Sequence, residues 1–106
     1  MYSDEEIERA VDWMRDNADS AAQAAGEVVR AEEFAKSTLA LVASGSNQET
    51  IAGQERDARA SAAYKKAIEE RVVAVYQDRK YRLLYSAAEA KIEVWRSEQA
   101  NARGKL

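Results

Sequence analysis

Apolar residues recur at helical spacing along almost the whole chain, beginning close to the N-terminus. Ser3 followed by Glu6 is the sequence signature of a capping box, so a helix is expected to start at about residue 4. The pair at 16–17, Asp-Asn, is typical of a helix end. These signals predict a short first helix over about 4–16. Its apolar face is formed by Ile7, Ala10, Val11 and Met14.

The second segment carries a nearly heptad stripe in which small residues predominate, and it predicts a helix over about 18–44. Small residues at a helix seam allow close approach of a second helix, although each contact then buries little apolar area. Gly26, which is unfavourable in a helix interior, is interpreted as the mark of such a close crossing. The stripe consists of Ala21, Ala25, Val28, Ala31, Ala35, Leu39 and Val42.

Residues 45–53 contain two glycines and several polar residues, and they form the one evident linker. A third helix is predicted over about 54–102, with Ser61 as an alternative N-cap. Its section from residue 60 onward would be about 65 Å long, against about 40 Å for the second helix. Roughly a third of this long helix therefore lacks a partner in a simple hairpin, and either the first helix or a second chain is expected to cover it.

The apolar positions of the long helix lie on one side but drift around it. Lys80 and Lys91 fall within this stripe, where their stems can pack or where they can set the register of a dimer. The predicted fold is all-α: one domain, 1–106, with a short N-terminal helix and an antiparallel, coiled-coil-like hairpin of two long helices, forming a homodimer. The stripe comprises Val73, Tyr76, Leu83, Leu84, Ala87, Ala88, Val94 and Trp95.

Composition narrows the possible chemistry. The chain has no histidine and no cysteine, so zinc sites, iron–sulfur sites and triads that depend on these residues are excluded. No phosphate-binding glycine loop or calcium-binding loop occurs. Acidic pairs at 32–33 and 69–70 resemble the carboxylates of bundle metal sites, but those sites also use histidine. We therefore predict no catalytic, cofactor-binding or metal-binding residues, and a protein that is not an enzyme.

Charge is distributed unevenly between the two halves. Residues 1–53 carry eleven acidic and four basic residues, whereas residues 54–106 carry eight acidic and twelve basic ones. Two interpretations stay open: the acidic arm of a hairpin lies beside its basic arm, or the basic half meets nucleic acid or an acidic protein. No apolar run approaches the ~20 residues of a membrane span, so no membrane association and a cytoplasmic location are expected.

The strongest candidate site is a run of basic residues beside tyrosines in the long helix. Basic side chains can contact phosphates while aromatic rings stack on bases. The same residues would also suit an acidic protein partner or the acidic half of this chain. The candidate patch comprises Tyr76, Arg79, Lys80, Tyr81, Arg82 and Tyr85.

A second candidate lies near the C-terminus, where Ile92 and Trp95 stand one helical turn apart. A large aromatic residue at this place is either an anchor of the core or, when exposed, a hot spot for binding another protein.

Two segments, 2–15 and 82–104, resemble a family of small helical proteins encoded by tailed phages and prophages. The resemblance implies a bacterial host cell as the setting, and it supplies no catalytic residues. The predicted function is a non-enzymatic accessory role through protein–protein interaction, with a host nuclease, a defence complex or a recombination partner as the target. The alternatives are a nucleic-acid-binding factor in phage replication or recombination, and a structural or assembly protein of the virion.

Overall fold

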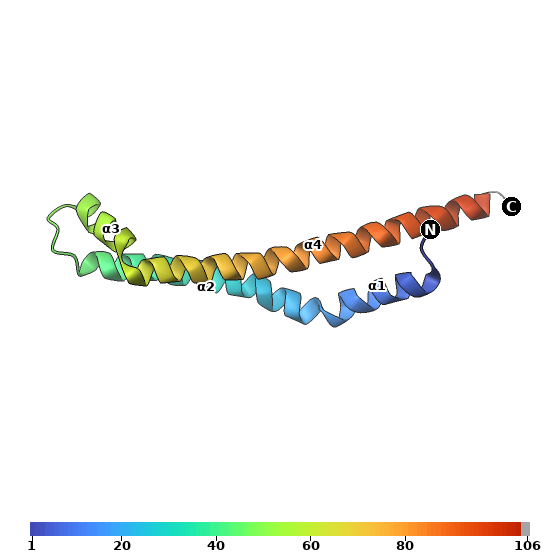
Figure 1. The fold of residues 1–106 in the computed structure, drawn as a ribbon, viewed down its shortest axis with the longest axis horizontal. Helices are drawn as coiled ribbons and strands as arrows, with labels where there is room; N and C mark the ends of the chain where they lie inside the picture. Colours follow the sequence, from blue (N-terminus) through green and yellow to red (C-terminus); the bar gives the residue numbers. More distant parts are fainter. Residues whose placement is uncertain (105–106) are drawn as a thin grey trace. The chain divides into compact units, whose positions relative to one another are not determined.

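The computed structural model describes residues 1–104, which form four α-helices and no strand. Figure 1 shows their order along the chain. The helices are α1 (Asp4–Asp16), α2 (Ala18–Ser44), α3 (Ile51–Ala60) and α4 (Ala62–Gly104). The prediction of an all-helical protein is confirmed for this part of the chain.

The first two helices have the bounds that the sequence predicts. The capping box is present: the Ser3 hydroxyl accepts a hydrogen bond from the Glu6 backbone N–H at 3.1 Å, and the Glu6 carboxylate accepts one from the Ser3 N–H at 3.2 Å. Asn17 ends α1 by donating its side-chain N–H to the Trp13 carbonyl oxygen. Together these bonds satisfy backbone groups that the helix ends would otherwise leave unpaired.

The predicted linker and third helix are wrong in two respects. The linker is shorter than 45–53, because Thr50 caps a new helix by accepting a hydrogen bond from the Gly53 N–H. The predicted helix over 54–102 is also interrupted at Ser61, whose backbone is extended. The Ser61 hydroxyl donates to the Ala58 carbonyl oxygen at 2.6 Å and accepts from the Tyr64 N–H at 3.2 Å. One side chain thus caps the end of α3 and the start of α4, which explains the break.

The chain divides into two compact units. The terminal unit comprises residues 1–22 together with α4 from Arg79 onward. In it, α1 lies along the C-terminal part of α4, as the blue and orange-red ribbons of Figure 1 show. The first helix therefore packs on this part of α4, which was one of the two ways in which the sequence allowed the long helix to be covered.

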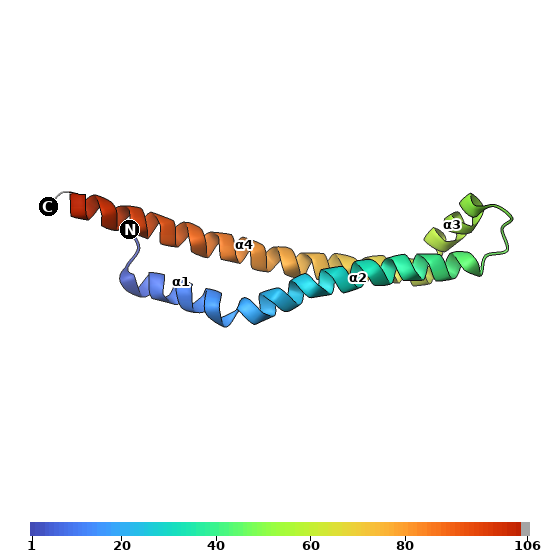
Figure 2. The same cartoon turned by 180° about the vertical axis from the view of Figure 1, so that it is seen from behind.

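The central unit comprises Gln23–Asp78. Here α2 lies beside the first turns of α4, as Figure 2 shows from behind. Glu32 pairs with Arg71, and Leu39, further along α2, lines a pocket with Tyr64, earlier in α4. The two helices of this unit therefore run in opposite directions. At the turn, Ser46 donates to a carboxylate oxygen of Asp57 at 2.7 Å and joins the linker to α3.

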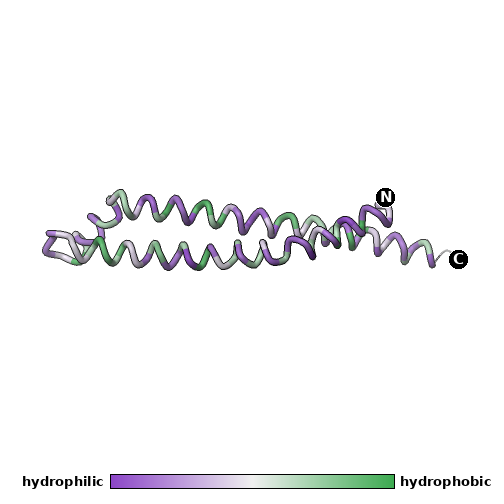
Figure 3. The backbone as a smooth tube through the Cα atoms, turned by 90° about the horizontal axis from the view of Figure 1, so that it is seen from below, coloured by the Kyte–Doolittle hydropathy of each residue, from purple (hydrophilic) through white to green (hydrophobic). Residues whose placement is uncertain are grey.

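Alanine fills the interior, and large apolar residues lie outside. Among residues 1–104 the buried apolar side chains are Ile7 and six alanines. Figure 3 shows apolar segments recurring along every helix between polar ones. Leu83 is 63% exposed and Phe34 is 55% exposed. Of the small seam residues predicted for α2, Ala35 is buried, but Ala25 is exposed and its neighbour Ala24 is buried instead. Much of the remaining apolar surface is left uncovered.

The structure contradicts the interpretation of Gly26 as the mark of a close helix crossing. A Cβ atom added at Gly26 would meet nothing within 4 Å, and the residue is exposed within α2. The substitution Gly26→Ala is therefore expected to stabilise the fold by about 1 kcal/mol, since alanine is favoured over glycine in helix interiors. Thermal unfolding followed by circular dichroism would measure this gain, and a lower melting temperature would show that the position needs glycine.

Candidate protein-interaction surfaces

One face of α4, its inner face, packs against α1 in the terminal unit. The Tyr85 hydroxyl donates a hydrogen bond to the Met14 backbone oxygen near the end of α1. The Tyr85 ring lies 5.2 Å from the Trp13 ring, with the planes tilted at 60°. Tyr85 therefore joins the two helices through both an aromatic contact and a hydrogen bond. The inner face consists of Tyr81, Tyr85, Ala88, Ile92 and Trp95, which are all buried or half-buried.

Of the predicted candidates, Trp95 contacts α1, and Ile92 is half-buried on the same face of α4. The Trp95 indole N–H donates to a carboxylate oxygen of Asp4 at 3.0 Å, at the start of α1. One turn earlier, the Lys91 ammonium lies 5.4 Å from the centre of the Tyr2 ring, in a cation–π contact. Of the two roles that the sequence left open for Trp95, the core anchor therefore fits its surroundings.

The residues of the predicted basic–aromatic patch lie in different surroundings in the structure. Tyr81 and Tyr85 are half-buried on the inner face, so their rings are not presented for base stacking. Arg79 and Lys80 are exposed on the other side of α4, and Arg82 is exposed as well. Tyr76, which is 64% exposed, belongs to the central unit. The six residues follow one another along a helix but do not form one continuous basic and aromatic face.

A second stripe follows the opposite side of α4 in the terminal unit. Its steps of three and four residues match the spacing of a coiled-coil seam. Every member is exposed, and Leu84 beside it is exposed as well. We call this set the outer stripe; it comprises Lys80, Leu83, Ala87, Ala90 and Val94. The single stripe predicted from the sequence is thereby corrected, because Ala88 and Trp95 lie on the inner face.

A third surface lies on α2 in the central unit. Phe34, the one phenylalanine of the chain, borders a groove of about 410 Å³ between α2 and α4. Leu41 is 76% exposed and lies two turns further on, on the same side of α2. We call Phe34 and Leu41, with this groove, the Phe34 surface. The groove is lined by Glu27, Arg30, Ala31, Phe34, Glu70 and Ala74.

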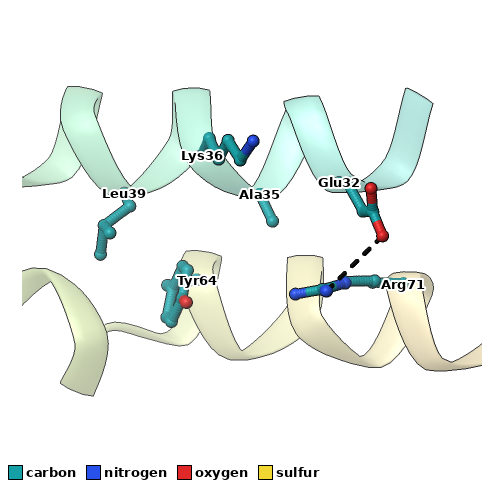
Figure 4. Close-up of a pocket in the computed structure, with 6 residues that line it drawn as sticks. All are labelled: Glu32, Ala35, Lys36, Leu39, Tyr64 and Arg71. Carbon is teal, nitrogen blue, oxygen red and sulfur yellow. Dashed lines mark ion pairs between the residues drawn. The ribbon is translucent and has the colours of Figure 1, made fainter. Parts of the chain in front are cut away.

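A smaller pocket of about 190 Å³ lies between the same two helices (Figure 4). Glu32 and Arg71 approach to 3.6 Å at one end, and Leu39 and Tyr64 lie at the other. The pair is partly exposed, so it contributes little stability, about 0–1 kcal/mol. It does join an acidic residue of the first half to a basic residue of the second, as the hairpin interpretation of the charge distribution predicts.

The sequence patterns did not identify Phe34 as a surface residue. They also did not predict that α4 has two separate faces. A large apolar residue of an amphipathic helix is expected to be buried, whereas Phe34 is 55% exposed. The signal for two faces in the sequence was the regular spacing of positions 80, 83, 87, 90 and 94. These positions form a line along the helix, about half a turn away from the line of inner-face residues. A helix with two apolar seams can pack on two partners at once.

No group of three or more metal-ligating side chains occurs among residues 1–104. Within the same described range, no helix has both the length and the apolar character needed to cross a membrane. Comparison with protein-family models, with curated proteins and with solved structures found no match to this chain.

Proposed function

We propose that this chain is a non-enzymatic accessory protein of tailed phages or prophages that acts as a homodimer and binds another protein. One observation carries the proposal: large apolar side chains lie outside while alanines fill the helix contacts. Exposed apolar surface is typical of protein-binding sites where such residues lie together, as Phe34 and Leu41 do on one side of α2. The phage setting rests on the sequence resemblance of residues 2–15 and 82–104 alone.

The Phe34 surface is the proposed site for the other protein. Its groove is lined by the apolar residues Ala31, Phe34 and Ala74 and by charged residues of both signs. This combination suits the apolar face of an amphipathic helix, with charged residues flanking it on both sides. Aromatic residues that can be enclosed in such a groove often carry most of the binding energy. A host nuclease, a defence complex or a recombination protein remains the proposed class of target.

The other two predicted functions receive less support. Binding of single-stranded nucleic acid would require aromatic rings beside the basic residues, but Tyr81 and Tyr85 are engaged with α1 or half-buried beside it. The role in virion assembly stays a prediction without a structural feature that favours it.

Affinity capture with surface variants tests the proposed function. The full chain, carrying a small tag, is used as bait in a lysate of the bacterial host, and enriched proteins are identified by mass spectrometry. The double variant Phe34→Glu/Leu41→Glu is expected to lose at least about nine-tenths of the enrichment of the true partner. Desolvating a carboxylate in an apolar groove is strongly unfavourable, whereas glutamate is compatible with a helix.

The matched control is Ala25→Glu/Ala40→Glu, which places two carboxylates on exposed positions of the same helix, away from the Phe34 surface. This control should capture the partner as the unmodified chain does. The candidate is then confirmed with the purified partner by titration calorimetry. Equal loss in both double variants, or no protein that distinguishes them, would contradict the proposed role of the Phe34 surface.

A further inference from the structure

We propose that the outer stripe of α4 is covered by the same stripe of a second copy, paired antiparallel about a two-fold axis level with residue 85. This inference deepens the proposed function and rests on its premise that the exposed apolar surface is an interface. It specifies the occupant, the direction and the register of one surface, and it uses none of the residues of the Phe34 surface.

The spacing of the outer stripe supports a helical partner. Positions 80, 83, 87, 90 and 94 alternate steps of three and four residues, so they stay on one side of α4 when the helix supercoils with another. In the terminal unit α1 contacts the opposite side of α4, through Tyr85 and Trp95. The outer stripe is therefore accessible to a second helix without displacement of α1.

A self-complementary register exists for this stripe. In an antiparallel pair with its axis level with residue 85, Leu83 meets Ala87 of the second copy, and Lys80 meets Ala90. Leu83 and Lys80 thus each face an alanine, which leaves room for their side chains, and Val94 meets Tyr76 of the second copy. Leu84, on one flank of the stripe, meets Leu84 of the second copy at the axis. The two-fold symmetry repeats the contacts away from the axis, as expected for a homodimer, whereas the Leu84 pair at the axis occurs once.

The charged residues beside the outer stripe favour an antiparallel pair of helices over a parallel pair. Arg79 and Glu93 lie on the same flank of the stripe, six residues before and eight residues after residue 85, so in this register their levels differ by about 3 Å along the helix. Antiparallel pairing therefore places Arg79 beside Glu93 of the second copy, and it does so twice. A parallel pair in register would instead place Glu93 beside Glu98 of the second copy, which is a repulsive arrangement. Glu93 and Arg79 are both exposed in the single chain. Glu93 also pairs with Arg96 of the same helix at 2.7 Å, so the carboxylate would be shared between Arg96 and Arg79 of the second copy.

Charge reversal on the two sides of the proposed pair tests the register. The dissociation constant of the full chain is measured by sedimentation equilibrium. Arg79→Glu alone and Glu93→Arg alone are each expected to weaken dimerisation about tenfold or more, because two attractive pairs become repulsive. The double variant Arg79→Glu/Glu93→Arg should recover an affinity within about threefold of the unmodified chain, since it restores both pairs in reversed order.

Distance measurement tests the direction independently and does not depend on interface variants. The chain has no cysteine, so Ser86→Cys and Ser97→Cys each provide one site for a spin label. In the antiparallel pair the two labels at position 86 lie close together, separated mainly by the ~10 Å between helix axes. The two labels at position 97 lie about 36 Å apart along the helix, because each is twelve residues from the axis.

Short distances at both positions would overturn the antiparallel direction, and a double charge variant no better than the weaker single variant would overturn the register. The absence of any dipolar signal between chains would overturn the second copy as the occupant. None of these results depends on the Phe34 surface. Loss of partner capture with an intact dimer would contradict the proposed function alone, whereas a monomer that still captures its partner would contradict this inference alone.

Discussion

Replacing Leu83 and Leu84 by glutamate is expected to convert a dimer of this chain into monomers. Each leucine is exposed in the single chain and becomes buried when the outer stripe pairs with a second copy. Burying a leucine side chain contributes roughly 1.5–3 kcal/mol, and the dimer contains two copies of each residue. Losing these contacts and bringing four carboxylates together would weaken dimerisation by more than about a thousandfold.

The measurement is the mass of the double variant in solution, by light scattering after size-exclusion chromatography. A matched control is Ala62→Glu/Ala63→Glu, two consecutive exposed residues in the first turn of α4. Glutamate is favourable there because it complements the positive end of the helix dipole. The control should keep the mass of the unmodified chain. A dimeric Leu83→Glu/Leu84→Glu variant with normal helix content would contradict the assignment of the interface to the outer stripe.

Replacing Ile7 by alanine is expected to destabilise the terminal unit by about 2–4 kcal/mol. Ile7 is 6% exposed and is the one large apolar residue among the buried side chains of residues 1–104. Removing its side chain leaves a cavity in the interior of the terminal unit. Because small domains have a total stability of about 5–15 kcal/mol, this loss is a large share of what is available.

Two observables report this loss. Urea unfolding followed by circular dichroism gives the change in the free energy of unfolding, and amide hydrogen exchange shows whether α1 opens first. Val11→Ala is the control, because Val11 lies on the same helix but is 46% exposed, and its loss should be within about 0.5 kcal/mol. Equal effects of the two substitutions would show that burial of Ile7 does not hold the terminal unit together.

Local signals predicted the helix ends well where one side chain makes the decisive bond. Ser3 with Glu6 marked the start of α1, and Asn17 marked its end, because each cap satisfies backbone groups within three or four residues. Ser61 was recognised as an alternative cap, but helix propensity favoured one continuous helix from residue 54. The structure follows the cap, because the Ser61 hydroxyl bonds on both sides of the break.

Contacts between distant residues could not be predicted in the same way. The hydrogen bond from Tyr85 to Met14 and the one from Trp95 to Asp4 join positions that no short-range pattern relates. These bonds decide which face of α4 is the inner face, and so which part of the predicted patch stays exposed. α1 packs on part of the length of α4 for which a simple hairpin offers no partner, but on one side only, so the opposite side is the one that a second copy can cover.

The mass of the unmodified full chain in solution tests the central claim most directly. With a chain mass of 11.8 kDa, pairing of the outer stripes predicts a particle of about 24 kDa by sedimentation equilibrium, dissociating on dilution as a single monomer–dimer equilibrium. A mass of 11.8 kDa at every concentration up to the solubility limit would contradict the account, because the exposed leucines of α4 would then have no second copy to cover them.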